Sequence, residues 1–243
     1  MTVSLLDRYD SSVKTPPASR SELDEVIVNI ELTLASIVQG LALSVLADNA
    51  SSVLSLGPSA AWLYVGAALL IILLFWSRAL IHTLTLIRWP LEFVHNFFYF
   101  VCVLIEVLAF KQLTNPFMWF LLNAIFALLV WGLFVHDLRI IRLRGRDSVG
   151  PSSFRLYAIV ETDQWLNIRI VMPTFFVFTL GSAAAIKLAP GIFLDRGGHV
   201  VLIAIYGIAL LVYLITVVSA FTRITPLISA TRAEWRDDLD ESI

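Results

Sequence analysis

Six stretches of about 20 mostly apolar residues are the feature that most constrains how this chain folds. A membrane-spanning helix needs about 20 apolar residues, because it must cross about 30 Å of hydrocarbon at 1.5 Å per residue. The chain is 58% hydrophobic and only 15% charged, which excludes an ordinary soluble domain. We therefore predict an all-α, polytopic membrane protein with six transmembrane helices, at residues 25–47, 60–82, 91–111, 116–137, 168–189 and 200–222.

The distribution of Lys and Arg predicts the orientation of these spans. An even number of spans places both termini on one side, and the side richer in Lys and Arg is the cytoplasmic one. Of the 17 basic residues, all but Lys111, Lys187 and Arg196 fall on the side of the termini. We therefore predict cytoplasmic termini. The predicted divisions are a leader at 1–24, a transmembrane domain at 25–222 and a tail at 223–243.

The polar segment between the fourth and fifth spans contains a candidate interfacial helix. The segment breaks at Gly145, Gly150 and Pro151, and aromatic residues then recur at near-helical spacing from Phe154 to Trp165. Aromatic and basic residues alternating along a helix favour a position in the membrane interface. We therefore predict one cytoplasmic interfacial helix between the fourth and fifth spans.

The first span carries a polar stripe. On a helix, six positions fall within an arc of about 100°: Glu25, Asn29, Thr33, Ser36, Gly40 and Ser44. Ser36, Gly40 and Ser44 also form a ladder of small residues, which lets two helices approach closely. The stripe is therefore either a packing seam or the lining of a pore. The candidate pore-lining residues of this span are Asn29, Thr33, Ser36, Gln39, Gly40 and Ser44.

A second polar stripe runs along the third span and ends at a carboxylate well inside the membrane. An ionised carboxylate facing lipid would cost several kcal/mol, so Glu106 must face protein or water, be paired, or be protonated. The stripe predicts either structural pairing or a path for ions or protons. Its residues are Glu92, His95, Asn96, Tyr99 and Glu106.

Titratable side chains gather at the predicted cytoplasmic ends of the spans. Arg78, His82, His136 and Asp137 could form a sensor that titrates near neutral pH, hold a divalent metal, or make interfacial hydrogen bonds. Their spacing lacks the HExxH pattern of metal-binding helices, and the chain has neither a phosphate-binding glycine loop nor a GxSxG motif. We expect no enzymatic activity, no metal and no other cofactor. The basic residues form no continuous face for a nucleic acid, so we expect no such partner.

Two segments carry a family resemblance. GLALS, residues 40–44, looks like an AIAIT-type segment on a first helix, and FWSRALIHTLTLIRWPLEFVHNFFYF, residues 75–100, runs from a Trp and a His to the asparagine Asn96. In this order they resemble the non-P-loop potassium channels of endolysosomes and their six-helix bacterial relatives. That family begins its first helix with an Arg followed by Phe-Ser-Asp. This chain departs from that pattern, because Ser36 stands where the aspartate would fall.

The resemblance implies a pore lined by first helices around a symmetry axis. Leu41 and Val45 would narrow this pore as further pore-lining residues, and Ser36 and Ser44 would flank the narrow part. We therefore expect a homo-oligomeric ion channel, a trimer or higher, that conducts a monovalent cation such as potassium. Its other partner would be membrane lipid, and its setting a bacterial inner membrane.

Two alternatives stay open from the residues alone. The first is a proton-coupled transporter or pH-responsive membrane protein that uses Glu106 with His95 and Glu92. The second is an intramembrane enzyme or a scaffold subunit with histidines as its site.

Overall fold

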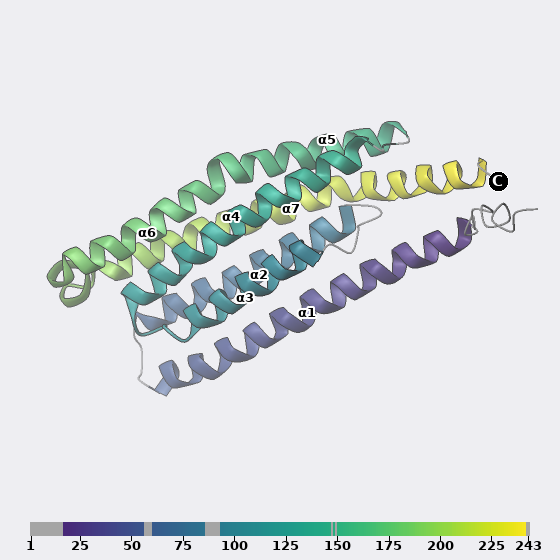
Figure 1. The fold of residues 1–243 in the computed structure, drawn as a ribbon. Helices are drawn as coiled ribbons and strands as arrows, with labels where there is room; N and C mark the ends of the chain where they lie inside the picture. Colours follow the sequence, from purple (N-terminus) through teal and green to yellow (C-terminus); the bar gives the residue numbers. More distant parts are fainter. Residues whose placement is uncertain (1–16, 56–59, 86–92, 147, 149, 242–243) are drawn as a thin grey trace, which may run out of the picture.

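The computed structural model describes residues 17–55, 60–85, 93–146, 148 and 150–241, and this part of the chain is helical apart from short turns (Figure 1). The prediction of an all-α fold is confirmed. The elements are α1 (Pro17–Ser55), α2 (Ala61–Thr85), α3 (Phe93–Phe110), α4 (Pro116–Arg146), α5 (Pro151–Leu166), the π-helix η1 (Asn167–Val171), α6 (Met172–Leu188), the π-helix η2 (Gly191–Asp195) and α7 (Gly198–Glu241).

Five helical segments are long and apolar enough to cross a membrane. They are Val28–Val53, Ala61–Thr85, Pro116–Arg146, Pro151–Leu188 and Gly198–Glu234. Each overlaps one of the predicted spans, and the chain is therefore a multi-pass membrane protein. The third predicted span corresponds to a shorter apolar helix, Val94–Phe110, and its first residues lie outside the described ranges.

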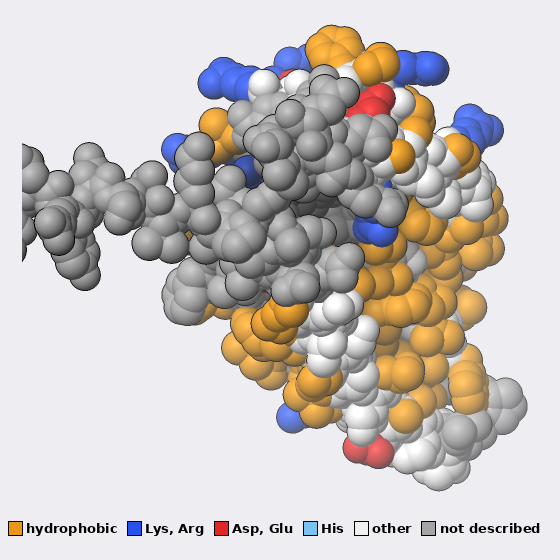
Figure 2. Space-filling model, turned by 90° about the vertical axis from the view of Figure 1, so that its right-hand side faces the viewer, with side chains coloured by type: hydrophobic (Ala, Val, Ile, Leu, Met, Phe, Trp, Pro, Cys, Tyr) orange, Lys and Arg blue, Asp and Glu red, His pale blue; other side chains and the backbone are white. Residues whose placement is uncertain are grey.

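The helices run side by side, and α1 begins at the same end of the bundle at which α7 ends (Figure 1). Figure 2 looks toward this end and shows Lys and Arg side chains gathered around it, with hydrophobic side chains over the flank below. An apolar flank of this extent suits contact with lipid tails, because lipid offers no hydrogen-bond partners.

The core of the bundle lies between α2, α4, α6 and α7, and α1 packs at its edge against α2 and α3. Aromatic rings pack together in the core where α2 and α4 begin: Trp119 lies edge-to-face against Tyr64, Phe120 and Tyr206 at centroid separations of 5.1, 5.2 and 5.5 Å. Such pairs add about 0.5–1.5 kcal/mol each beyond the area they bury. The edge position leaves one face of α1 uncovered by the part of the chain that the structure describes.

The predicted helix between the fourth and fifth spans is present as α5, but it packs lengthwise between α4 and α7 and continues through η1 into α6 (Figure 1). Its apolar side has a core of its own, in which Leu156 and Tyr157 meet Ile141 of α4 and Ile228 of α7. This burial explains why α5 aligns with its neighbours instead of lying across the bundle. The π-turn η1 precedes Pro173, whose missing N–H cannot complete a regular α-helical turn.

Helical structure continues beyond the apolar stretches at both ends of the described chain. α1 begins at Pro17, eight residues before the predicted span, and α7 runs to Glu241 through Pro226. Proline suits the first position of a helix, because its missing N–H would have no partner there. The boundaries predicted at 24 and 223 thus separate apolar from polar sequence within continuous helices. Residues 1–16 of the predicted leader lie outside the described ranges.

A carboxylate from α7 caps the start of α5. The backbone N–H groups of Ser152 and Ser153 donate to Glu234 at 2.7 and 2.9 Å. A Cβ on Gly150 would lie only 2.6 Å from the Glu234 carboxyl carbon, so glycine permits this approach. Negative charge at a helix N-terminus pairs with otherwise unsatisfied N–H groups. The contact therefore joins α5 to α7 as well as capping α5.

Replacing Glu234 with alanine should fray the first turn of α5 and lower stability by about 1 kcal/mol, the usual effect of losing a helix cap. Hydrogen exchange at residues 151–155 is the measurement. Glu234→Gln keeps one acceptor oxygen and should lose less protection. Equal protection in wild type and Glu234→Ala would contradict the capping role.

Candidate functional site

The polar stripe of α1 lies on the exposed side of the helix. Asn29, Thr33, Ser36, Gly40 and Ser44 are all exposed. The opposite side, which packs on α2 and α3, buries Glu31, Ala35, Gln39, Ala42 and Leu46. The stripe therefore points away from its own chain.

Two predicted pore-lining residues do not lie on this exposed face. Gln39 is only 3% exposed, and its side-chain amide donates to Glu106 at 3.3 Å, so this residue faces α3 and not the exposed side of α1. It is three positions from Ser36, which places it about 60° from that residue, on the side facing α3. Val45 is half-buried at the edge of the face, whereas Leu41 is 62% exposed.

The exposed face contains two residues that the sequence analysis did not select. Ile37 is 65% exposed and lies one turn before Leu41. Asp48 is exposed and lies one turn after Ser44. Both continue the i, i+4 spacing of the stripe, which is the signal that could have identified them.

The third-span stripe faces the opposite way, into the protein. Asn96 donates to the buried Glu31 of α1 at 2.7 Å, and Glu106 accepts from Gln39. Tyr99 is buried, with its ring stacked on Phe75 of α2 at 4.7 Å between centroids. Glu92 lies outside the described residues. Polar contacts on this face therefore attach α1 to α3 at two levels.

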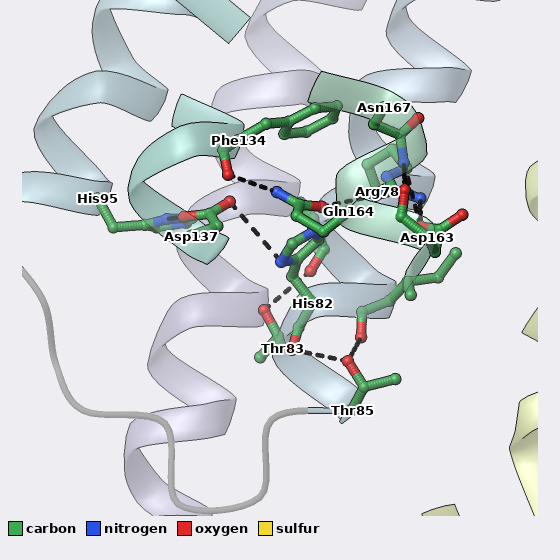
Figure 3. A network of polar contacts seen from close by, with 12 residues as sticks. Arg78, His82, Thr83, Thr85, His95, Phe134, Asp137, Asp163, Gln164 and Asn167 are labelled. Carbon is green, nitrogen blue, oxygen red and sulfur yellow. Dashed lines mark hydrogen bonds and ion pairs between the residues drawn. The ribbon is translucent and has the colours of Figure 1, made fainter. Parts of the chain in front are cut away.

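Asp137 of α4 lies between two histidines (Figure 3). One carboxylate oxygen is 2.8 Å from His95 Nδ1 of α3, and the other is 3.7 Å from His82 Nδ1 of α2. The Asp137 side chain is 2% exposed. His82 and Asp137 from the predicted sensor cluster are thus brought together, and His95 joins them. His136 precedes Asp137 by one position, which turns it about 100° away around α4.

Arg78 binds a different carboxylate. Its guanidinium donates to Asp163 at 2.7 Å and to Gln164 at 3.2 Å, on the last turn of α5 (Figure 3). Gln164 in turn donates to the backbone carbonyl of Phe134 at 2.8 Å, and the Arg78 guanidinium lies 5.1 Å from the Phe134 ring centroid. Arg78 therefore connects α2 to α4 and α5.

The π-helix η1 extends this network to α7. The Asn167 amide donates to the Asp163 carboxylate at 3.1 Å, and the Tyr213 hydroxyl donates to Asn167 at 2.6 Å. A wide π-turn changes the direction of the side chains that follow it, which suits the placement of Asn167 toward α7. The sequence analysis missed Asn167, Gln164 and Tyr213, because their partners come from distant segments.

Arg78 separates two small pockets inside the bundle. The first, of about 60 Å³, is apolar and lies between α2, α4, α6 and α7, with Phe75, Phe175 and Tyr206 in its walls. The second, of about 40 Å³, lies between α2, α5 and α7 and is lined by His82, Thr85 and Asp163 among apolar residues. Both pockets are far smaller than the volume of about 300–1,000 Å³ that encloses a drug-sized ligand.

Within the described ranges, no group of three or more His, Cys, Asp or Glu side chains has the arrangement of a metal site. Comparisons with known protein families, curated proteins and solved structures found no match. The channel-family resemblance of residues 40–44 and 75–100 therefore stays a prediction.

Replacing Asp137 with leucine should destabilise the protein by about 1–3 kcal/mol, because His95 Nδ1 would lose its hydrogen bond to this carboxylate and His82 would lose the carboxylate 3.7 Å from its ring nitrogen. Thermal unfolding of the purified protein measures this. Asp137→Asn keeps an acceptor oxygen and should cost less, and the exposed Asp195→Asn is the control. Unfolding temperatures of Asp137→Leu that match Asp195→Asn would show that the histidines do not depend on this carboxylate.

Proposed function

We propose that the protein is a homo-oligomeric channel for monovalent cations, with a pore lined by α1 from each copy. The observation that carries the proposal is the exposed polar face of α1, which lies opposite the face packed on α2 and α3. Facing lipid, an amide such as Asn29 would lose its hydrogen bonds, and each buried unpaired polar group costs about 1–3 kcal/mol. Water in a pore, or a second copy, removes that cost.

The ladder of small residues supports assembly between copies. Ser36, Gly40 and Ser44 lie on the exposed face, and a Cβ built on Gly40 meets nothing within 4 Å. The ladder therefore forms no packing seam with the other described helices of its own chain. Three or more copies around a closed symmetry axis would enclose a pore with one stripe from each.

The chemistry of the exposed face favours monovalent cations. Hydroxyl and amide oxygens of Thr33, Ser36 and Asn29 are neutral ligands that replace part of a hydration shell. Asp48 lies on the same face, toward the C-terminal end of α1. One Asp48 from each copy would form a ring of carboxylates that attracts cations. Ile37 and Leu41 supply large apolar side chains for a constriction that opens by wetting.

The proposal places the protein in a bacterial inner membrane with six spans, of which α3 is the third. The end of the bundle that carries Arg139, Arg146 and Arg155 would face the cytoplasm, because basic residues are retained on that side. Lys111 and Lys187 would face the opposite side.

Replacing Leu41 with asparagine should increase the flux of potassium, because a polar side chain at the constriction favours water in the pore. The measurement is cation flux from liposomes that contain the purified protein. Ile208→Asn introduces the same side chain at an exposed position of α7 and should leave flux unchanged. No selective flux from wild type or Leu41→Asn, with the protein present in the bilayer, would refute the channel.

The reactivity of single cysteines introduced into α1 toward a thiol reagent should depend on which face of the helix carries them. Ser36→Cys and Ser44→Cys lie on the exposed face and should be modified by a water-soluble thiol reagent in liposomes, whereas Ala42→Cys is buried and should not. The native Cys102 is fully buried, so it adds little background. Failure of both serine-derived cysteines to react would place the stripe in a dry seam.

A second candidate function is a proton-coupled transporter. The observation that favours it is Asp137 between His82 and His95, since chains of buried carboxylates and histidines can relay protons. Proton uptake that accompanies solute transport, and that is lost in Asp137→Asn, would favour this function over the channel.

A further inference from the structure

Glu106 lies deep in the protein at the seam between α1 and α3. It is 13 residues from the start of α3, about 20 Å along the helix axis. The residue is 1% exposed, and the neutral amide of Gln39 donates a hydrogen bond to it. Among the residues that the structure describes, three buried oxygen atoms of this cluster have no hydrogen-bond partner: Glu106 Oε1, Gln39 Oε1 and the Tyr99 hydroxyl.

This arrangement does not suit a carboxylate ion. In the part of the chain that the structure describes, no basic side chain forms an ion pair with Glu106. A buried charge without an opposite charge is disfavoured by several kcal/mol, and such a group takes up a proton instead. The acid proton would also supply a hydrogen-bond donor to a cluster in which oxygen atoms outnumber donors.

We propose that Glu106, with Gln39 and Tyr99, is a proton-binding site that keeps α1 seated on α3 while the carboxyl group is protonated. Loss of the proton would place an unpaired negative charge in the seam between the two helices. The charge would then favour movement of α1 that admits water to Glu106. The remaining polar attachment of α1 to α3, Glu31 to Asn96, lies two helical turns away.

The described groups packed around Glu106 are uncharged, and the other carboxyl at the seam, Glu31, lies about two helical turns away. α1 contributes the neutral Gln39, and α2 contributes the Phe75 ring, which stacks on Tyr99. On α3, Tyr99 and Cys102 are buried beside Glu106, and Asp137 of α4 lies beyond Cys102 next to its histidines.

The connection to α1 deepens the proposed function and rests on it. Gln39, which contacts Glu106, is adjacent to Gly40 and two residues from Leu41, on the opposite flank of the same turn. A change in the position of Gln39 relative to α3 would therefore also move the exposed face of α1. Under the channel proposal, alkaline pH on the side that reaches Glu106 would alter the pore.

The test is infrared spectroscopy of the full-length protein in lipid nanodiscs during a pH titration. We expect a carbonyl band of a protonated carboxyl at neutral pH, which disappears at alkaline pH. The band should be missing in Glu106→Gln and present in Glu234→Gln, the same substitution at a carboxylate that caps α5. Identical spectra for wild type and Glu106→Gln would overturn the proposal, as would a band that appears only when sodium and potassium are removed.

Gln39→Leu provides a second arm that keeps the carboxyl group. Removal of the amide partner should shift the frequency of the same band, and an unshifted band would overturn the assignment of the site to this pair. This arm also applies if Glu106→Gln fails to fold.

Movement of α1 is measured by thiol modification of Ser44→Cys, relative to Ile208→Cys on α7 at each pH. The ratio of rates should rise severalfold at alkaline pH with Glu106 present and stay constant in Glu106→Gln. If the ratio of rates stays constant both with Glu106 and in Glu106→Gln, the proposal that the protonation state of Glu106 controls the position of α1 is refuted. If the carbonyl band is present but no cation flux is found, the channel is refuted and the proton site is supported. If flux is found but the band is absent, the proton site is refuted and the channel is supported.

Discussion

The cost of leaving a polar group without a partner in a membrane is the constraint on which the rest of this structure depends. Lipid tails accept no hydrogen bonds, so each polar side chain inside a span must find protein, water or a proton. Several of those in this chain turn inward and pair across helices. Arg78 with Asp163, Asp137 with His95, and Asn96 with Glu31 each join two different helices. The polar contacts therefore also specify which helices are neighbours.

The polar side chains of α1 do not all meet this constraint by pairing across helices. Its inner face makes two polar attachments to α3, at Glu31 and Gln39, and its outer face presents hydroxyls and an amide away from the chain. A helix at the edge of a bundle normally exposes apolar residues to lipid, as α7 does at Ile208 and Val212. The contrast between these two exposed helices is the basis for proposing that α1 meets other copies and water.

The two polar attachments of α1 differ in chemical character. Glu31 receives a hydrogen bond from an asparagine near the basic end of the bundle, whereas Glu106 lies deeper and faces a neutral glutamine. Of these two carboxyl groups, Glu106 is the more deeply buried, and its Oε1 has no hydrogen-bond partner among the described residues. A proton is the smallest ligand that resolves this arrangement, because it adds no volume to a packed seam. The same helix thus carries an outer face suited to ions and an inner face suited to control by protons.

Hydropathy by itself determined that the chain is all-α and multi-pass, since any stretch of about 20 apolar residues in lipid must form its hydrogen bonds internally. Helical periodicity also grouped Asn29, Ser36 and Ser44 on one face of α1, because neighbours along a helix have fixed angular positions. Only the tertiary structure decided that this face is exposed and that Gln39 donates a hydrogen bond to Glu106. It also decided that Arg78 forms its ion pair with Asp163 and not with Asp137. Those outcomes depend on which helices pack together, and the periodicity of a single helix contains no information about its neighbours.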